Sequence, residues 1–254
     1  MKLSAAVFST SGTCMTRNED NFLCGSQMAD SDETDQCRAV ETESDAVFAV
    51  FDGMGGEKDG HVISRICAEQ LLKCEADCRD SHDAFYAEAN RLTVAYMNEH
   101  GGQQSGSTAV LISFTKGQAF VTNIGDSRAY ILRDGILSQL TEDHTAVRRL
   151  IRIGMLTPEE AAKDNRRHTL TQFIGIPESE FQISPFSAEP ITPRTGDRFL
   201  LCSDGVHDTL DNDTLTKLLS DTKSDARTLA EHIVKTAMEH GSNDNVTALA
   251  VFVE

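Results

Sequence analysis

The fold of this chain is decided by one stretch, residues 46–56, which reads AVFAVFDGMGG. Its first six residues are apolar and rich in β-formers, a pattern typical of a buried strand. Asp52 follows that strand directly, and the glycines behind it favour a sharp turn. A carboxylate at the mouth of a buried strand is fixed by the sheet and can point into a cleft. The stretch therefore predicts a strand that delivers an acidic side chain to a site.

The same placement recurs elsewhere in the chain. Acidic residues adjoin other predicted strands at Glu19, Asp20, Asp126, Asp204 and Asp244. Several carboxylates can share one cleft only if a cation offsets their repulsion. Because the donors are oxygens, we expect a hard ion, Mg²⁺ or Mn²⁺ ahead of Ca²⁺, with the Gly53 carbonyl as a further ligand. The alternative is that each Asp-Gly pair is only a turn. Four such loops favour the metal site.

The order of the other elements indicates an α+β fold. Strands are predicted at residues 3–10, 20–24, 46–51, 108–114, 118–124, 128–132, 136–140, 181–187, 198–202 and 246–253. Apolar residues at helical spacing predict helices over 58–77, 81–100, 211–220 and 225–240, and residues 145–169 form a polar helical segment. Residues 25–45, with seven acids against one arginine, are interpreted as a solvated loop. Strands joined by tight turns favour one domain, residues 1–254, with antiparallel sheets.

Composition limits the function and the surroundings. The chain has 254 residues, is 39% hydrophobic and carries a net charge of −17, from 40 acidic and 23 basic residues. This charge argues against nucleic acid or an anionic membrane as the main partner, and favours a monomer whose copies repel one another, or a protein that holds cations. Seven cysteines without metal-ligand spacing suit idle thiols in a reducing compartment. With no signal peptide or spanning segment in the sequence, we expect a cytoplasmic protein.

Six motifs then carry a family resemblance. In order, they are residues 17–21 (RNEDN), 52–56 (DGMGG), 105–108 (SGST), 123–130 (NIGDSRAY), 203–205 (SDG) and 244–247 (DNVT). Each motif alone is only weakly specific. Taken in order over residues 11–253, the six resemble the motifs of the protein phosphatase 2C family in its bacterial form. The resemblance implies a four-layer α-β-β-α sandwich in which two antiparallel sheets are flanked by helices. It also implies hydrolysis of protein phosphoserine or phosphothreonine by a metal-activated water, which fits the absence of a Cys-x₅-Arg loop.

The resemblance assigns roles to single residues. It implies that Asp52 bridges two Mn²⁺ or Mg²⁺ ions, that the Gly53 carbonyl binds the second, and that Asp204 and Asp244 bind the first. Glu19 and Asp20 would hold metal-bound waters, and Asp126 would contribute to a third, weaker ion. Residues 145–169 match a flap beside the active site. Phosphoproteins made by a serine/threonine kinase would be the substrates.

Two positions depart from the family pattern. The family usually has a phosphate-binding arginine where this chain has Met15, so Arg17 either takes its place or faces solvent. The histidine that often follows the two glycines is Glu57 here, and His61, one helical turn further on, either donates the proton to the leaving group or is a bystander. These departures leave two alternatives to an active phosphatase, namely a catalytically weak scaffold or sensor that binds metal and phosphoprotein, and an acidic calcium-binding protein.

Overall fold

The computed structural model describes residues 1–30, 35–43, 45–55, 59–74, 79–101 and 105–254. Two six-stranded sheets and one two-stranded sheet organise these residues, and every strand pair in them is antiparallel. The first sheet has the order β11(Ile136–Gln139), β10(Arg128–Arg133), β13(Arg198–Cys202), β14(Val246–Val253), β1(Leu3–Thr10), β4(Asp35–Thr42). The second has the order β12(Phe186–Ser187), β9(Gln118–Ile124), β8(Ala109–Thr115), β5(Ala46–Phe51), β2(Asn21–Cys24), β3(Gln27–Met28), and β6(Gly53–Met54) pairs with β7(Gly106–Ser107).

The two large sheets stack face to face. Successive side chains of a strand point to opposite faces, and in these strands the side chains on both faces are largely apolar. On β5, Phe48 and Val50 enter the core between the sheets, while Phe51 packs on the helical side. The ring of Phe114 meets the rings of Phe48 and Phe199 edge to face, with centroids 6.0 and 5.3 Å apart. Contacts of this kind fix the separation of the sheets.

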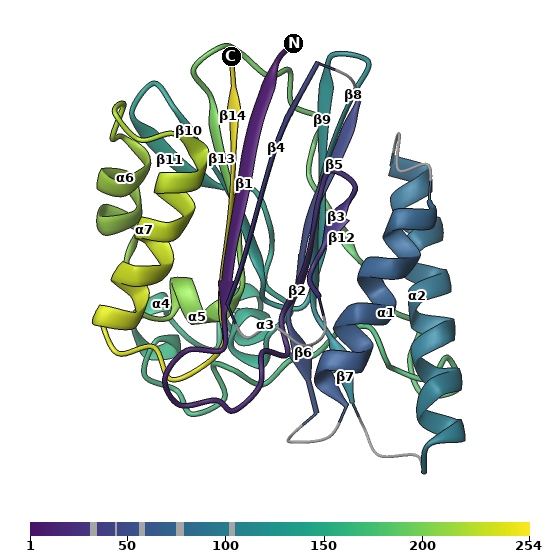
Figure 1. The fold of residues 1–254 in the computed structure, drawn as a ribbon. Helices are drawn as coiled ribbons and strands as arrows, with labels where there is room; N and C mark the ends of the chain where they lie inside the picture. Colours follow the sequence, from purple (N-terminus) through teal and green to yellow (C-terminus); the bar gives the residue numbers. More distant parts are fainter. Residues whose placement is uncertain (31–34, 44, 56–58, 75–78, 102–104) are drawn as a thin grey trace.

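Helices cover the two outer faces, as Figure 1 shows. The second sheet is covered by α1(Gly60–Lys73) and α2(Arg79–Glu99), and the first by α5(Asp204–His207), α6(Asn212–Leu219) and α7(Ala226–Glu239). Residues buried under α7 include Ala248 and Ala250, the small side chains of β14 that point away from the core. The predicted four-layer α-β-β-α sandwich is therefore confirmed. None of the described helices is both long and apolar enough to cross a membrane.

Three sequence predictions need correction. The predicted loop 25–45 contains β3 and the eight-residue β4, which pairs with β1 along its whole length. Its charges misled the prediction because β4 is an edge strand, where charged side chains face solvent and discourage edge-to-edge pairing. The predicted strand 181–187 forms only β12. The predicted helical segment 145–169 contains two short helices, α3(Ala146–Arg152) and α4(Pro158–Ala161), separated by turns.

The topology brings the loops with the predicted acidic residues to one end of the sandwich. Strands β1, β5, β9 and β13 end there, and β2 and β14 begin there, opposite the two chain termini (Figure 1). Gly53 allows the close packing of this end, because a Cβ atom would collide with the carbonyl oxygens of Glu19 and Gly60. Gly125 has φ +90°, and a Cβ there would lie 2.6 Å from Thr108. Both loops therefore require glycine.

The α2–sheet interface contains a fully buried histidine. His82 is 0% exposed, its Nδ1 lies 3.1 Å from Thr122 Oγ1, and its Nε2 has no hydrogen-bond partner among the described residues. Burial lowers the pKa of His82 to about 4. The folded state therefore holds this imidazole neutral at pH values where the unfolded chain protonates it.

We expect this histidine to weaken the protein in acid. The folded-state pKa is depressed, so its contribution is fully present above pH ~6.5 and is lost as the pH falls toward ~4, by up to about 3 kcal/mol. The free energy of unfolding of the wild type should fall relative to that of His82→Gln over this range, measured by urea denaturation. His232→Gln, at an exposed helix position, is the control. Parallel pH profiles for wild type and His82→Gln would contradict the prediction.

Candidate metal centre

Five of the predicted aspartates lie close together at this end of the sandwich. They are near enough for their negative charges to change one another's pKa values. The pKa of Asp52 is raised well above its ordinary value, first by burial and then by the negative charges of the other four. These are Asp20, Asp126, Asp204 and Asp244. Without cations, the cluster therefore retains protons in order to reduce its own repulsion.

Asp20 is held at the bottom of the cluster by two hydroxyl groups. Its Oδ2 accepts hydrogen bonds from Ser203 Oγ at 2.9 Å and Thr247 Oγ1 at 2.6 Å, whereas its buried Oδ1 has no partner among the described residues. Burial raises the pKa of Asp20 to about 8, against the lowering effect of the two hydroxyls. The structure thus fixes the direction of this carboxylate and leaves one oxygen to bind something else.

Asp204 has the same feature. It follows β13 at the start of α5, and its buried Oδ1 has no hydrogen-bond partner in the part of the chain that the structure describes. Burial raises its pKa, while nearby His207 opposes the rise. Asp126 is likewise buried, and its pKa is raised first by burial and then by Asp204. Buried carboxylate oxygens without donors are the groups that a divalent cation satisfies.

Asn245 ties the loop before β2 to the cluster. Its Oδ1 accepts from the Glu19 amide at 2.7 Å, and its Nδ2 donates to the carbonyls of Ser11 and Arg17 at 3.2 and 3.1 Å. Because Asn245 directly follows Asp244, one buried side chain fixes three points of residues 11–19 beside that aspartate. Glu19 is also buried, and its pKa is raised first by burial and then by Asp244.

Two histidines stand beside Asp204, although the sequence argument placed no nitrogen ligand in these loops. The Nε2 of His207 lies 3.1 Å from the Asp126 carbonyl, and its Nδ1 lies 3.4 Å from Asp208. His168, from the predicted flap, places Nδ1 3.1 Å from Asp208. Among the described residues, donor atoms of His168, Asp204 and Asp208 lie within 4.8 Å of one another, a spacing that could hold a metal ion. Asp126, expected to contribute to the weaker ion, lines the same cavity as His168 and Asp208.

Met15, which stands where the family has its arginine, and Arg17, the nearest arginine, both lie at the surface. Arg17 is near enough to Glu19 for its charge to lower that carboxyl's pKa, against the effect of burial. Its guanidinium Nη1 lies 2.8 Å from His61 Nε2 at the start of α1. The structure thus brings Arg17 to the edge of the cluster. Met15 is 41% exposed.

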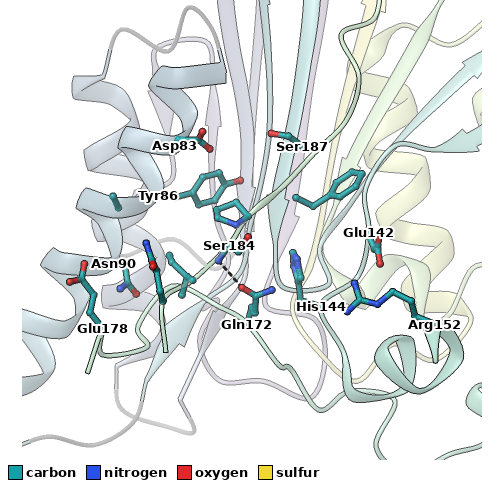
Figure 2. Close-up of a pocket in the computed structure, with 15 residues that line it drawn as sticks. Asp83, Tyr86, Asn90, Glu142, His144, Arg152, Gln172, Glu178, Ser184 and Ser187 are labelled. Atoms are coloured by element: carbon teal, nitrogen blue, oxygen red, sulfur yellow. Dashed lines mark hydrogen bonds between the residues drawn. The ribbon is translucent and has the colours of Figure 1, made fainter. Parts of the chain in front are cut away.

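One cavity opens beside the cluster, and another is lined by none of its residues. The first, of 600 Å³, contains Asp126, His207 and Asp208 together with Arg148 and other residues of α3 and α4, so it joins the cluster to segment 145–169. Figure 2 shows the other, of 760 Å³, in which Tyr86 and Asn90 of α2 face His144 and Arg152 across Gln172. None of the predicted metal ligands lines that second cavity. The cavity beside the cluster is therefore the one relevant to the metal centre.

Several residues that shape the site were missed from the sequence. Two of them, Ser203 and Thr247, orient Asp20. The others are Asn245, His207 and Asp208. Ser203 and Asn245 directly adjoin predicted ligands, which was the signal that could have found them. Nothing in the sequence pairs Asp20 with Thr247, because 227 residues separate them.

Comparison with known proteins agrees with this geometry. The family model of protein phosphatase 2C matches residues 7–150. Serine/threonine protein phosphatase PstP of Mycobacterium tuberculosis is 30% identical over 99% of this chain and 45% of its own length. Serine/threonine phosphatase stp of Listeria monocytogenes is 30% identical over 82% of this chain and 85% of its own. This chain thus spans about half the length of the first relative and most of the second.

Solved structures show the same fold. The crystal structure of M. tuberculosis PstP/Ppp superposes with a TM-score of 0.84 at 29% identity, over all of both chains. The PstP catalytic domain in complex with two manganese ions gives 0.79 at 28% identity, over 99% of each. The chain therefore has the same sandwich fold as these phosphatase structures. The chain is a member of the protein phosphatase 2C family.

The raised pKa values predict that metal binding releases protons. Asp20 has a pKa of about 8 and the pKa of Asp52 is raised well above its ordinary value, so at about pH 7 the cluster holds protons that a divalent ion must displace. The apparent affinity for Mn²⁺ should therefore rise with pH. Calorimetry in two buffers of different ionisation enthalpy measures the protons released, and Asp20→Asn should release fewer. Binding without proton release would contradict the prediction.

Proposed function

We propose that this protein is a metal-dependent protein serine/threonine phosphatase. The observation that carries the proposal is the convergence of five aspartates in a chain of the protein phosphatase 2C family. Two of them have buried oxygens that no donor among the described residues reaches. An acidic calcium-binding protein would need no such set of family motifs. The retention of Asp52, Asp204 and Asp244 favours the enzyme over a catalytically weak scaffold or sensor.

The donor set fits two hard divalent ions, Mn²⁺ or Mg²⁺, because it consists of carboxylates and one carbonyl. We assign Asp52 as the bridging ligand and the Gly53 carbonyl as a ligand of the second ion. Asp204 and Asp244 would hold the first ion, and Glu19 and Asp20 would hold metal-bound waters. Asp126 would contribute to a third, weaker site, near which His168 and Asp208 supply further donors.

When bound, these ions would lower the pKa of water and offset negative charge on the phosphoryl oxygens. The chain itself orients the reactants. Ser203 and Thr247 hold Asp20, and Asn245 holds the loop that carries Glu19 and Arg17. Arg17 would bind phosphoryl oxygens as a charged hydrogen-bond donor. The proposed reaction uses no side chain as a nucleophile, and the phosphoryl group would pass directly to water.

Residues 145–169 would act as the flap that recognises the protein substrate. The segment has six basic and three acidic residues, a net charge of +3, in a chain whose total is −17. Arg148, Arg149 and Arg152 are exposed on α3, and Arg148 and Arg152 line cavities that open beside Asp126 or His144. A positive patch here would attract the acidic flanks of a phosphoprotein. The substrates would be products of a serine/threonine kinase, and the phosphatase would work as a cytoplasmic monomer.

The first test is the bridging aspartate. Mn²⁺- or Mg²⁺-dependent hydrolysis of a phosphopeptide should vanish with chelator and fall by several powers of ten in Asp52→Asn, because a neutral amide cannot bridge two dications. Each tenfold loss corresponds to about 1.4 kcal/mol of barrier. Phosphate release with and without added Mn²⁺ measures this. Full activity in Asp52→Asn, or activity that survives chelation, would refute the binuclear centre.

The second test separates the flap from the chemistry. Reversal of Arg148, Arg149 and Arg152 to Glu should lower kcat/KM for a phosphoprotein by at least about tenfold while a small aryl phosphate is hydrolysed nearly as before. Added salt should slow the wild-type phosphoprotein reaction, because exposed charges are screened beyond ~8–10 Å. Reversal of Arg227, an exposed arginine of α7, is the control. Equal losses on both substrates would contradict recognition by the flap.

A further inference from the structure

The two departures from the family pattern meet in space. Arg17 stands two residues after the position where the family has its arginine, and His61 lies four residues after the position where it often has a histidine. Although 44 residues apart, they join through Arg17 Nη1 and His61 Nε2 at 2.8 Å. The same Nη1 lies 3.2 Å from His61 Nδ1. A guanidinium can only donate, so a ring nitrogen accepts and His61 is neutral in this contact.

Hydrogen bonds tie the segments that carry both partners to residues beside the acidic cluster. The carbonyl of Arg17 accepts a hydrogen bond from Asn245 Nδ2 at 3.1 Å, next to Asp244. Ser64 Oγ, one turn after His61 on α1, donates to the Glu19 carbonyl at 2.6 Å. The contact between the two side chains is therefore made between two anchored segments. It is built into the edge of the site.

The choice of a neutral acceptor matters for the charge of Arg17. Acidic groups surround the pair, since Glu19 acts on Arg17 and Asp59 acts on His61. A carboxylate that held Arg17 would also cancel its positive charge. An imidazole holds the guanidinium in place and leaves that charge for an anionic ligand. Burial, then the charge of Arg17, lower the pKa of His61 and so preserve its neutral form.

The guanidinium also keeps donors for a second partner. His61 takes Nη1, and no residue of the described chain accepts a hydrogen bond from Nη2 or Nε of Arg17. These two nitrogens lie on one edge of the guanidinium plane and match two oxygens of a phosphoryl group. Arg17 is exposed, so a substrate can reach that edge.

We propose that His61 is a positioning residue that orients Arg17 toward the phosphoryl oxygens of the substrate, so that the pair replaces the arginine missing at Met15. The inference rests on the proposed phosphatase function, whose ions would lie beside Glu19. It assigns His61 no proton transfer. It makes the precise direction of Arg17, and so the affinity for phosphate, depend on a side chain of α1.

The experiment measures phosphate binding and turnover separately. In the Mn²⁺-loaded protein, Arg17→Ala should weaken inorganic phosphate binding by about tenfold and raise KM for a phosphopeptide equally, with kcat within about twofold. His61→Ala should reproduce most of this loss, and the double variant should be no worse than Arg17→Ala. His61→Asn, which keeps a neutral acceptor, should restore binding in part, whereas His61→Glu should not.

Two further variants complete the design. Met15→Arg should rescue His61→Ala, because it supplies an arginine that does not need His61. His232→Ala, at an exposed position of α7, should leave phosphate binding unchanged. Additive losses in the double variant, or unchanged phosphate affinity in His61→Ala, would overturn the inference. An inactive wild type whose phosphate binding still depends on both residues would instead overturn the proposed phosphatase function and leave the pair intact.

Discussion

Mutual repulsion among buried carboxylates is the constraint on which this structure depends. Five aspartates meet at one end of the sandwich, and burial raises the pKa values of Asp20, Asp52, Asp126 and Asp204. Such a cluster opposes folding unless protons or cations neutralise it. The rest of the fold supplies the opposing stability, because each aspartate follows or precedes a strand whose own residues are buried in a packed sheet. Hydroxyl and amide donors then fix the directions in which the carboxylates point.

Much of this was visible in the sequence because it depends on local patterns. A run of apolar β-formers that ends in Asp-Gly predicts both a buried strand and the end at which its carboxylate appears, and Asp52 and Asp204 follow that rule. The edge strand β4 was missed for the opposite reason. It pairs with β1 on one side, and no strand of the described residues lies on the other. Its solvent-facing charged side chains therefore mask the two-residue alternation of apolar and polar residues that is typical of a strand. Segment 145–169 was expected to be helical, and Thr157-Pro158-Glu159-Glu160 indicates a helix N-terminus within it. In the structure Thr145 and Thr157 each cap one of its two short helices.

The residues that orient the ligands could not be predicted, because sheet register decides them. Thr247 reaches Asp20 because β14 pairs antiparallel with β1, opposite Ser9, and Ser203 reaches it because β13 pairs with the other edge of β14. A shift of one residue in either ladder would turn these hydroxyls away from the site. His168 joins the group through a tertiary contact of segment 145–169 with α5. These contacts exist only once both sheets have formed.

Charge explains how an acidic chain can act on an anionic substrate. A body that carries −20 outside the flap would repel a phosphate ester, so attraction must come from a few local sources. In the proposed phosphatase, ions would neutralise the carboxylate cluster and the flap would present its exposed arginines. Arg17 stands at the edge of the cluster, against an acceptor that leaves its charge intact. Each source acts over a short range because salt screens exposed charges. Attraction would thus be confined to the one end of the sandwich where the proposed ligands converge, and the remaining acidic surface would repel phosphorylated groups that approach elsewhere.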